Sequence, residues 1–472
     1  MKEKQKGSIL GKELRYYCYV SLGLLFLAAI LFDTPHGILE GMKQIILSRD
    51  ALITDYFELA GYGAGFFNAA VMMLISILLI ESVKIPYTGL TLAVIFISVG
   101  FGFWGKNPIN SIPIILGSWI YSKAHKSHFA RYVYTALFAT CLAPFVTELV
   151  YILPFSKLIN LIIAVGIGIF IGYVIPPLSM HTASMHMGYN LFNVGFAGGT
   201  LAFVMYCILK AYGIQSEAVF IWKAERHPAI MIVLALYFIA TFAWGLYLEK
   251  GRMSGLLKIL AHPGRAVADF VMMDGPGTTL MNMGIMGLLA ETYVLFVDGD
   301  MSGPILGCVL TVFGFSAFGA HVRNYLPVLL GVAISAFLTN QSANAPGILI
   351  ASFFVVGISP IAGQFGVGAG IIAGLLHAAV VLCTSQMYGG LNLYNNGFSC
   401  GWVAIVMIPM IESFMKHFEY SKQRKEEQVY KKWFIKMKGC IRVAKNLAAN
   451  PSQQAEMKKS FLINKVSFIA PT

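Results

Sequence analysis

The stretch Gly100-Phe-Gly-Phe-Trp-Gly-Lys-Asn-Pro-Ile-Asn110 returns in the second half of the chain as Gly314-Phe-Ser-Ala-Phe-Gly-Ala-His-Val-Arg-Asn324. The match extends outward, without a gap, to Asp55–Trp119 in the first half and Asp269–Ala333 in the second. The identical positions are mainly glycine, asparagine and proline, which shared hydrophobicity alone would not produce. Internal duplication in a very apolar chain is typical of membrane transporters and channels.

The composition is that of an integral membrane protein. The chain has 472 residues, of which 57% are hydrophobic and 12% are charged, whereas soluble domains carry roughly 25% charged residues. Apolar runs long enough to cross a bilayer fill most of the sequence. The apolar stretch after the basic Met1–Arg15 lacks a small-residue cleavage site, so we expect it to remain as the first span. The sequence therefore predicts an all-α polytopic membrane protein.

Hydrophobic runs predict seven transmembrane or re-entrant segments in each half. The expected segments are 16–32, 61–83, 88–104, 108–122, 131–153, 158–176 and 188–210, then 229–248, 275–297, 303–318, 322–338, 347–363, 365–381 and 390–412. The expected domains are a basic N-terminus (1–15), repeat 1 (16–210), a connector (211–228), repeat 2 (229–412) and a basic tail (413–472). An odd number of segments per repeat predicts that the second copy enters the membrane upside down, which gives two inverted repeats.

Loop charges agree with that topology. The loop Asp33–Glu58 is acidic, whereas its counterpart Glu249–Asp269 is basic. Cationic loops prefer the cytoplasm, so we expect the two loops on opposite sides and both termini in the cytoplasm. Much of the net charge of +12 gathers after Lys416, which predicts contact with anionic lipid rather than with nucleic acid.

The quoted glycine-rich stretches each precede a short segment, 108–122 or 322–338. Glycine and proline interrupt helices, and unpaired backbone at membrane depth is tolerated only against protein or water. We therefore expect discontinuous or re-entrant helices that meet near the centre, and the alternative is an ordinary kinked helix. Lys106 and Arg323 flank the two interruptions, where they either bias what enters or snorkel to the interface.

Asparagines recur at matching positions of the two halves. A second duplicated block, Gly188 to Phe196, returns as Gly390 to Phe398 and adds two asparagine pairs. Lipid cannot satisfy the donors and acceptor of an amide, so we expect the pairs to line a path for a small polar solute. The alternative is hydrogen bonding between helices. The expected lining residues are Asn68, Asn282, Asn107, Asn110, Asn324, Asn190, Asn392, Asn193 and Asn395, with Trp104 and Phe318 as flanking aromatics that could equally be packing residues.

Few acidic residues lie within apolar runs. Glu148 aligns with Gln364, and Glu291 lies in the ninth segment, so these are candidate coupling or gating residues. The alternative for Glu148 is a solvated position near an interface. We find no phosphate-binding loop, nucleophile elbow or metal motif, and expect no enzyme activity, metal or other cofactor. His186 near Ser184 is the one faint catalytic pair.

The residues from about 10 to 420 resemble an uncharacterised bacterial integral-membrane family, catalogued as domain of unknown function 1576. Gly102-Phe-Trp-Gly-Lys-Asn-Pro-Ile-Asn110 and Gly188-Tyr-Asn190 are also similar to motifs of the urea transporter architecture. That resemblance implies inverted halves, each with a half-membrane pore helix followed by a span. The first resemblance implies a bacterial inner, or plasma, membrane.

Together these observations predict a channel or facilitator for a small polar solute, with the path between the two repeats. One alternative is a proton- or sodium-coupled secondary transporter that uses Glu148 and Glu291. A second alternative is an intramembrane enzyme or sensor. The expected partners are the solute and the lipid bilayer, and the chain could form a homo-oligomer.

Overall fold

The computed structural model describes the backbone of residues 2–417 and the side chains of residues 11–417 except Ser385. These residues form α-helices, short 3-10 turns and loops, with β-structure limited to isolated bridges in the described part. Within the described residues, ten helices are long and apolar enough to cross a membrane. The prediction of an all-helical, multi-pass membrane protein is therefore confirmed.

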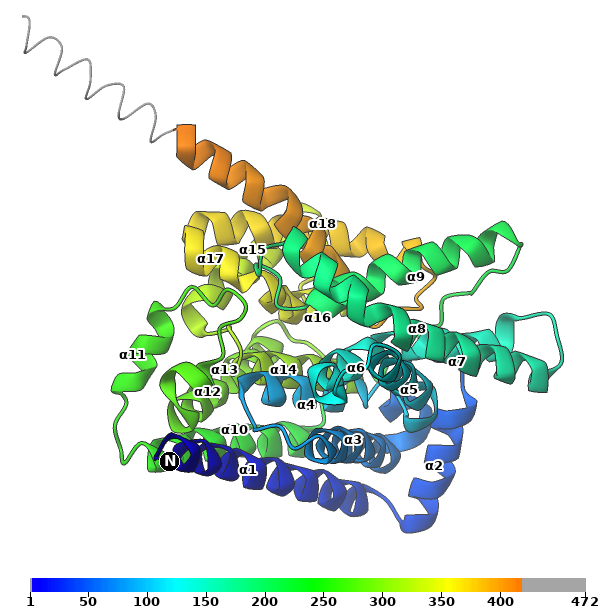
Figure 1. Cartoon of the computed structure of the whole chain (residues 1–472), viewed down its shortest axis with the longest axis horizontal. Helices are drawn as coiled ribbons and strands as arrows, with labels where there is room; N and C mark the ends of the chain where they lie inside the picture. The colour runs from blue at the N-terminus through cyan, green and yellow to red at the C-terminus, as the bar shows by residue number, and fades with distance from the viewer. Residues whose placement is uncertain (1, 418–472) are drawn as a thin grey trace, which may run out of the picture. The chain divides into compact units, whose positions relative to one another are not determined.

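The first half contains most of the expected segments as helices (Figure 1). Its helices are α1 (Lys2–Phe32), α2 (Pro35–Leu47), α3 (Tyr56–Ser82), α4 (Gly89–Phe101), α5 (Pro108–Ala124), α6 (Val133–Ala139), α7 (Ala143–Ile152), α8 (Lys157–Met185) and α9 (Asn193–Ala211). The short α2 was not expected from the sequence. Its buried residues recur at helical spacing, and the rest of its surface is largely exposed.

The second half repeats this order. Its helices are α10 (Pro228–Leu248), α11 (Ser254–Ala261), α12 (Phe270–Asp274), α13 (Pro276–Phe296), α14 (Gly303–Phe315), α15 (Val322–Leu338), α16 (Pro346–Phe354), α17 (Ser359–Phe365), α18 (Val367–Met387) and an unlabelled helix, Asn395–His417. The expected basic tail, 413–472, lies almost wholly outside the described residues. The unit Met1–Met407 is compact, and a separate unit begins at Ile408.

The last segment of each half begins later than expected. We predicted helix from residue 188 and from residue 390, but α9 begins at Asn193 and its counterpart at Asn395. Gly188 and Gly390 have φ angles of 82° and 75°, a conformation that glycine adopts without a side-chain clash. The duplicated glycines therefore make turns, which we call the third break (residues 186–192) and the fourth break (residues 388–394).

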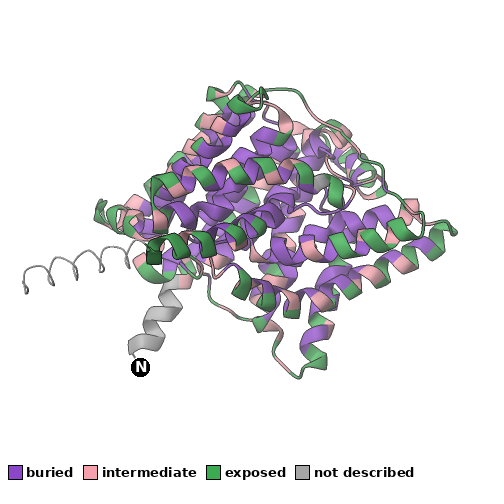
Figure 2. Ribbon diagram, turned by 90° about the horizontal axis from the view of Figure 1, so that it is seen from above, coloured by how far each residue is buried: buried purple, intermediate pink, exposed green. Residues whose placement is uncertain are grey.

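The short helices α4 and α14 form the centre of the unit. Each has 13 residues, about 20 Å at 1.5 Å per residue, which is too short for a hydrocarbon core of about 30 Å. Nearly every residue of both helices is buried, and Figure 2 shows buried residues gathered in the interior helices. They pack closely, since a Cβ on Gly100 would lie 2.5 Å from the Gly307 carbonyl oxygen.

Each central helix is followed by a non-helical turn, as the duplicated sequence predicted. The first break, residues 102–107, joins α4 to α5, and the second break, residues 316–321, joins α14 to α15. Gly105 and Gly319 occupy equivalent places with φ angles of 72° and 96°. The two halves thus share one backbone plan.

Aspartates cap the central helices across the two repeats. Asp55 Oδ1 accepts the Gly303 N–H at 3.2 Å, at the start of α14. Asp269 accepts the Gly89 and Leu90 N–H groups at 2.8 and 3.1 Å, at the start of α4. Each aspartate also caps its own helix. We call this reciprocal pair of contacts the inter-repeat clasp.

Other contacts between the halves are reciprocal too. Gly195 and Gly397, which align in the repeat, meet each other, with a Cβ on either lying within 3.2 Å of the other's Cα. Their neighbours Phe196 and Phe398 lie 6.0 Å apart between ring centroids. A residue that meets its own equivalent is what a two-fold relation between copies produces. The opposite orientation of the repeats in a bilayer stays a prediction.

Burial changes the loop-charge argument. Asp50 and Asp55, two of the acids that made the 33–58 loop acidic, are fully buried. The backbone of this loop pairs with the connector, because the Ile53 carbonyl accepts the Ile221 N–H at 2.9 Å. The acidity that this loop presents to solvent is therefore smaller than its sequence indicates.

Candidate functional site

Asparagine side chains hold the first two breaks in place. Asn68 Nδ2 donates to the carbonyls of Gly102 and Lys106 at 2.6 and 2.8 Å. Asn282 Nδ2 makes the equivalent pair of bonds to the second break, at 2.7 and 2.9 Å. These amides satisfy backbone groups that the missing helical turn leaves open.

A second asparagine also forms hydrogen bonds with the backbone of each break. Asn110 Oδ1 accepts the Asn107 N–H at 2.9 Å, and its Nδ2 donates to the Gly105 carbonyl at 3.2 Å. Asn324 makes the same two bonds to the second break, both at 2.9 Å. The amides thus fix the backbone, as the alternative of structural hydrogen bonding expected. Their role in solute binding stays a prediction.

A buried carboxylate lies beside the first break. Asp50 accepts hydrogen bonds from Tyr56 Oη (2.8 Å), Thr147 Oγ1 (2.9 Å), Asn110 Nδ2 (3.0 Å) and Asn107 Nδ2 (3.2 Å). Burial in this loop raises the Asp50 pKa to about 7, although the hydrogen bonds oppose the shift. The Asp50 carboxylate therefore links three helices, α3, α5 and α7.

The second repeat lacks this acid network. The positions equivalent to the network are Gly264, Phe270, His321, Asn324 and Gly363. Only the Asn110 equivalent keeps its residue type. The backbone plan is therefore duplicated, but the ionisable chemistry is not.

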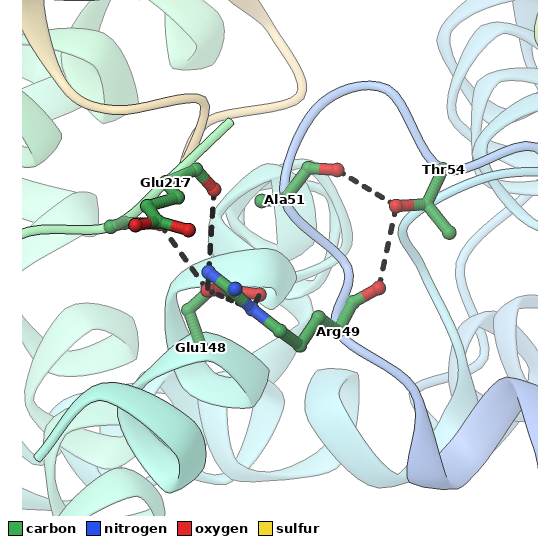
Figure 3. Close-up of polar contacts among 6 residues, drawn as sticks. Arg49, Ala51, Thr54, Glu148 and Glu217 are labelled. Atoms are coloured by element: carbon green, nitrogen blue, oxygen red, sulfur yellow. Dashed lines mark hydrogen bonds and ion pairs between the residues drawn. The ribbon is translucent and has the colours of Figure 1, made fainter. Parts of the chain in front are cut away.

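Glu148 is buried and paired rather than solvated. Arg49 Nη2 lies 2.7 Å from Glu148 Oε2, and Arg49 Nε lies 3.1 Å from the same oxygen (Figure 3). Ser216 Oγ also donates to this carboxylate at 3.2 Å. Arg49 further donates to the Glu217 carbonyl at 3.3 Å, which ties the pair to the connector.

The other two candidate coupling residues are placed differently. Gln364 is exposed near the end of α17. Glu291 is buried in α13, and its Oε2 has no hydrogen-bond partner among the described residues. The structure thus separates the three residues that the sequence grouped as coupling candidates.

The third and fourth breaks are shaped by a second duplicated amide. Asn190 Oδ1 and Asn392 Oδ1 each accept the backbone N–H two residues further on, at 2.9 and 3.0 Å. Asn190 Nδ2 donates across the repeat to the Gly397 carbonyl at 3.1 Å. Asn392 Nδ2 is fully buried and has no such partner within residues 2–417.

The last asparagine pair also contacts neighbouring side chains. Asn193 Oδ1 lies 2.9 Å from His186 Nε2, and Asn395 accepts a hydrogen bond from Tyr388. The Ser184 hydroxyl donates to the backbone carbonyl of His181 rather than to a histidine ring. No nucleophile–base pair is formed there by these described residues.

Aromatic rings surround the place where the repeats meet. The central aromatic cluster comprises Phe101, Phe138 and Phe192 of the first half and their equivalents Phe315, Phe354 and Tyr394 of the second. Phe101 and Tyr394 lie 4.8 Å apart between ring centroids, and the equivalent pair, Phe315 and Phe192, lies 4.6 Å apart. Of the two predicted flanking aromatics, Trp104 stacks on Phe101 at 5.0 Å.

A cavity of about 430 Å³ is lined in part by this cluster. Its wall includes Val267, which is 80% exposed, as well as the buried Phe192 and Tyr394. The wall combines residues of both halves. The sequence-predicted residues in the wall are Asn190, Asn193 and Phe318.

Lys106 lies against the cluster rather than at the membrane interface. Its side chain is fully buried, so the snorkelling alternative is wrong for this residue. Its Nζ lies 5.7 Å from the Phe101 ring centroid and 6.0 Å from that of Tyr394. Arg323, in contrast, is exposed, and its Nη1 donates to the Leu260 carbonyl at 3.3 Å.

A family model described as "Protein of unknown function (DUF1576)" matches residues 34–211 and 248–413. The chain belongs to this family. The two matched regions of this DUF1576 protein each cover most of one repeat and leave out nearly all of the connector. No curated protein and no solved structure matches the chain.

Two residues of the site were missed by the sequence reasoning, because Asp50 was counted as a loop charge and Tyr394 as an ordinary member of the repeat. Lys106 was expected either to bias what enters or to snorkel, and its contact with the aromatic cluster was not expected. The available signal was asymmetry: within the duplicated blocks, Lys106 aligns with Ala320, and Tyr394 aligns with Phe192. Positions that differ within a repeated frame mark where one copy has acquired separate chemistry.

Proposed function

We propose that this protein lets a small polar solute cross the membrane along a path between two inverted repeats. The observation that carries the proposal is the cavity lined by both halves, whose wall includes Asn190 and, from the central aromatic cluster, Phe192 and Tyr394. Ligand sites in proteins are mostly apolar cavities with a few placed polar groups, and this cavity has that character.

The broken helices support the same proposal. Non-helical backbone at membrane depth is found only where protein buries it or where it lines an aqueous space. The first two breaks satisfy much of their backbone through Asn68, Asn282, Asn110 and Asn324, which fixes their conformation. Phe318 of the second break lines the cavity. Such breaks supply polar groups in the interior without exposing an open helix end to lipid.

The inter-repeat clasp favours a fixed path over a rocking motion. Gly89 and Gly303 each begin a central helix in one half and are capped from the other half. Rocking one repeat against the other would break these buried, charge-assisted bonds, which are stronger than neutral ones. We therefore favour facilitated, channel-like permeation in the plasma membrane, with both termini in the cytoplasm.

A second candidate is proton- or sodium-coupled transport. The buried Glu291, whose Oε2 lacks a partner in the described chain, favours it, whereas Glu148 is already neutralised by Arg49. In this case Glu291→Gln would abolish accumulation against a gradient but leave downhill flux. Downhill flux that ignores pH and sodium in the unmutated protein argues against coupling.

Filling the cavity tests the proposed path. Val194 lines the cavity, and Val204 lies on the same helix, half-exposed on its outer face. We expect Val194→Trp to lower the flux of small amides, polyols or organic acids into proteoliposomes at least tenfold, because the new ring occupies the path. Val204→Trp is the matched control and should leave the flux unchanged. Wild-type flux in a folded Val194→Trp protein would remove this cavity from the path.

A further inference from the structure

Lys106 is the most unusual charged residue of the structure. It is fully buried, and its Nζ has no hydrogen-bond partner among the described side chains. No carboxylate among the described residues forms an ion pair with it, and the rings of Phe101 and Tyr394 lie beside its Nζ. An ammonium group in such a place is unfavourable unless something negative accompanies it.

Residues linked to Lys106 by contacts also carry hydrogen-bond donors without acceptors. Trp104 Nε1 and the Tyr394 hydroxyl are both buried and unpartnered in the described part of the chain. Ring contacts connect them, because Trp104 stacks on Phe101 and Phe101 meets Tyr394. Buried polar groups are normally satisfied, so these open donors point to a missing acceptor.

The same groups show what kind of ligand would fit. A lone ammonium matches one negative charge, and its buried aromatic surroundings disfavour an ion that keeps a large hydration shell. Ring edges carry partial positive charge, so the aromatic neighbours tolerate an anion at their edges. We propose that Lys106, with Tyr394, binds a small monovalent anion, and that such an anion is the solute that permeates.

This proposal rests on the proposed function in its second half only. Anion binding depends on Lys106, whereas permeation also needs the path along the cavity. Both a carboxylate, such as formate or acetate, and a halide, such as chloride, have the required charge and size. The experiment therefore measures binding and flux separately.

Binding is measured as the rise in thermal unfolding midpoint of the full-length protein in detergent. Sodium formate, acetate or chloride is added against sodium gluconate at constant ionic strength. We expect a concentration-dependent rise of several degrees in the wild type. Lys106→Met should abolish the rise, and Lys123→Met, at an exposed lysine, should retain it. Which salts give the rise distinguishes carboxylate from halide.

Tyr394→Phe is the second variant, because its equivalent Phe192 shows that a phenylalanine ring fits this place in the repeat. It should weaken the salt-dependent rise without abolishing folding. A wild type that gains no stability from any of the three salts overturns the anion site. So does a Lys106→Met protein that gains as much as the wild type.

Flux is measured in proteoliposomes with the same anions and with a neutral polyol. Anion flux that falls at least tenfold in Lys106→Met but not in Lys123→Met supports the anion as solute. Polyol flux that is equal in all variants, with no anion flux, overturns the anion as solute and leaves the proposed function standing. Lys106-dependent binding with no flux of any solute has the opposite meaning: the anion site stands, and the proposed function fails.

Discussion

Removing the Asp269 carboxylate should loosen the contact between the two repeats. Asp269 accepts the N–H groups of Gly89 (2.8 Å), Leu90 (3.1 Å) and Met272 (3.2 Å), and the Gly89 bond is buried. In Asp269→Ala these donors lose their acceptor at once. A buried donor left unpaired costs about 1–3 kcal/mol, and partly exposed donors cost less because water reaches them.

We therefore expect Asp269→Ala to lower the free energy of unfolding by about 2–5 kcal/mol. Asp269→Asn keeps the oxygen that binds Gly89 and Met272 and should lose about 1 kcal/mol, mainly the bond to Leu90. The measurement is SDS-driven unfolding in mixed micelles, followed by tryptophan fluorescence.

The matched control is Asp298→Asn, because Asp298 has a φ angle of 61°, which asparagine tolerates better than alanine. Asp298 forms an ion pair with Arg226, but its side chain is 79% exposed. Exposed ion pairs contribute about 0–1 kcal/mol, so the control should be nearly as stable as the wild type. If Asp269→Ala and Asp298→Asn are equally stable, the cap across the repeats contributes nothing, and the fixed path loses its support.

Three further predictions concern the acid network, the breaks and the topology. The folded-state pKa of Asp50, raised from 3.8 to about 7, means that stability present at low pH is lost as pH rises through 7. The loss should be up to about 4 kcal/mol between pH 4 and 8, and Asp50→Asn should flatten it; a wild-type stability that is flat over this range contradicts the shift. Asn68→Leu and Asn282→Leu should each lower the unfolding free energy by about 2–6 kcal/mol, since each leaves two buried carbonyls unpaired. A large loss in one and none in the other would show that the two breaks are not held alike. Cysteines introduced at Glu40 and Lys250 should react with an impermeant maleimide from opposite sides of the membrane, and labelling from a common side would exclude inverted repeats.

The duplication predicted much of the fold because local backbone constraints are visible in sequence. Gly105 and Gly319 have positive φ angles, and a position that needs such an angle favours glycine, so it can be recognised in the sequence. The asparagines next to them predicted polar contacts at the same places. The helix α8 was underestimated, because the expected segment stopped at residue 176, whereas the helix passes through Pro176 and Pro177 and continues to Met185.

The chemistry of the site was harder to predict because it depends on contacts between distant residues. Asp50 binds Thr147, which lies in another helix almost a hundred positions along the chain. Lys106 is buried because the first break turns its side chain onto Phe101 and Tyr394, and neither the turn nor the partner is local. Amide roles were likewise invisible: a duplicated asparagine that fixes backbone looks, in sequence, like one that contacts a solute.

The reciprocal caps of Asp55 and Asp269 are the contacts that a single ancestral repeat would make with a second copy of itself. A homodimer of that repeat must keep identical residues at both sites, because one gene encodes both. Two copies within one chain are free of that constraint, so one half can carry Lys106 and Asp50 while the other has Ala320 and Gly264 at the equivalent positions. The capping aspartates are thus a symmetric contact, whereas the unmatched lysine and aspartate are features that only a fused chain can hold in a single copy.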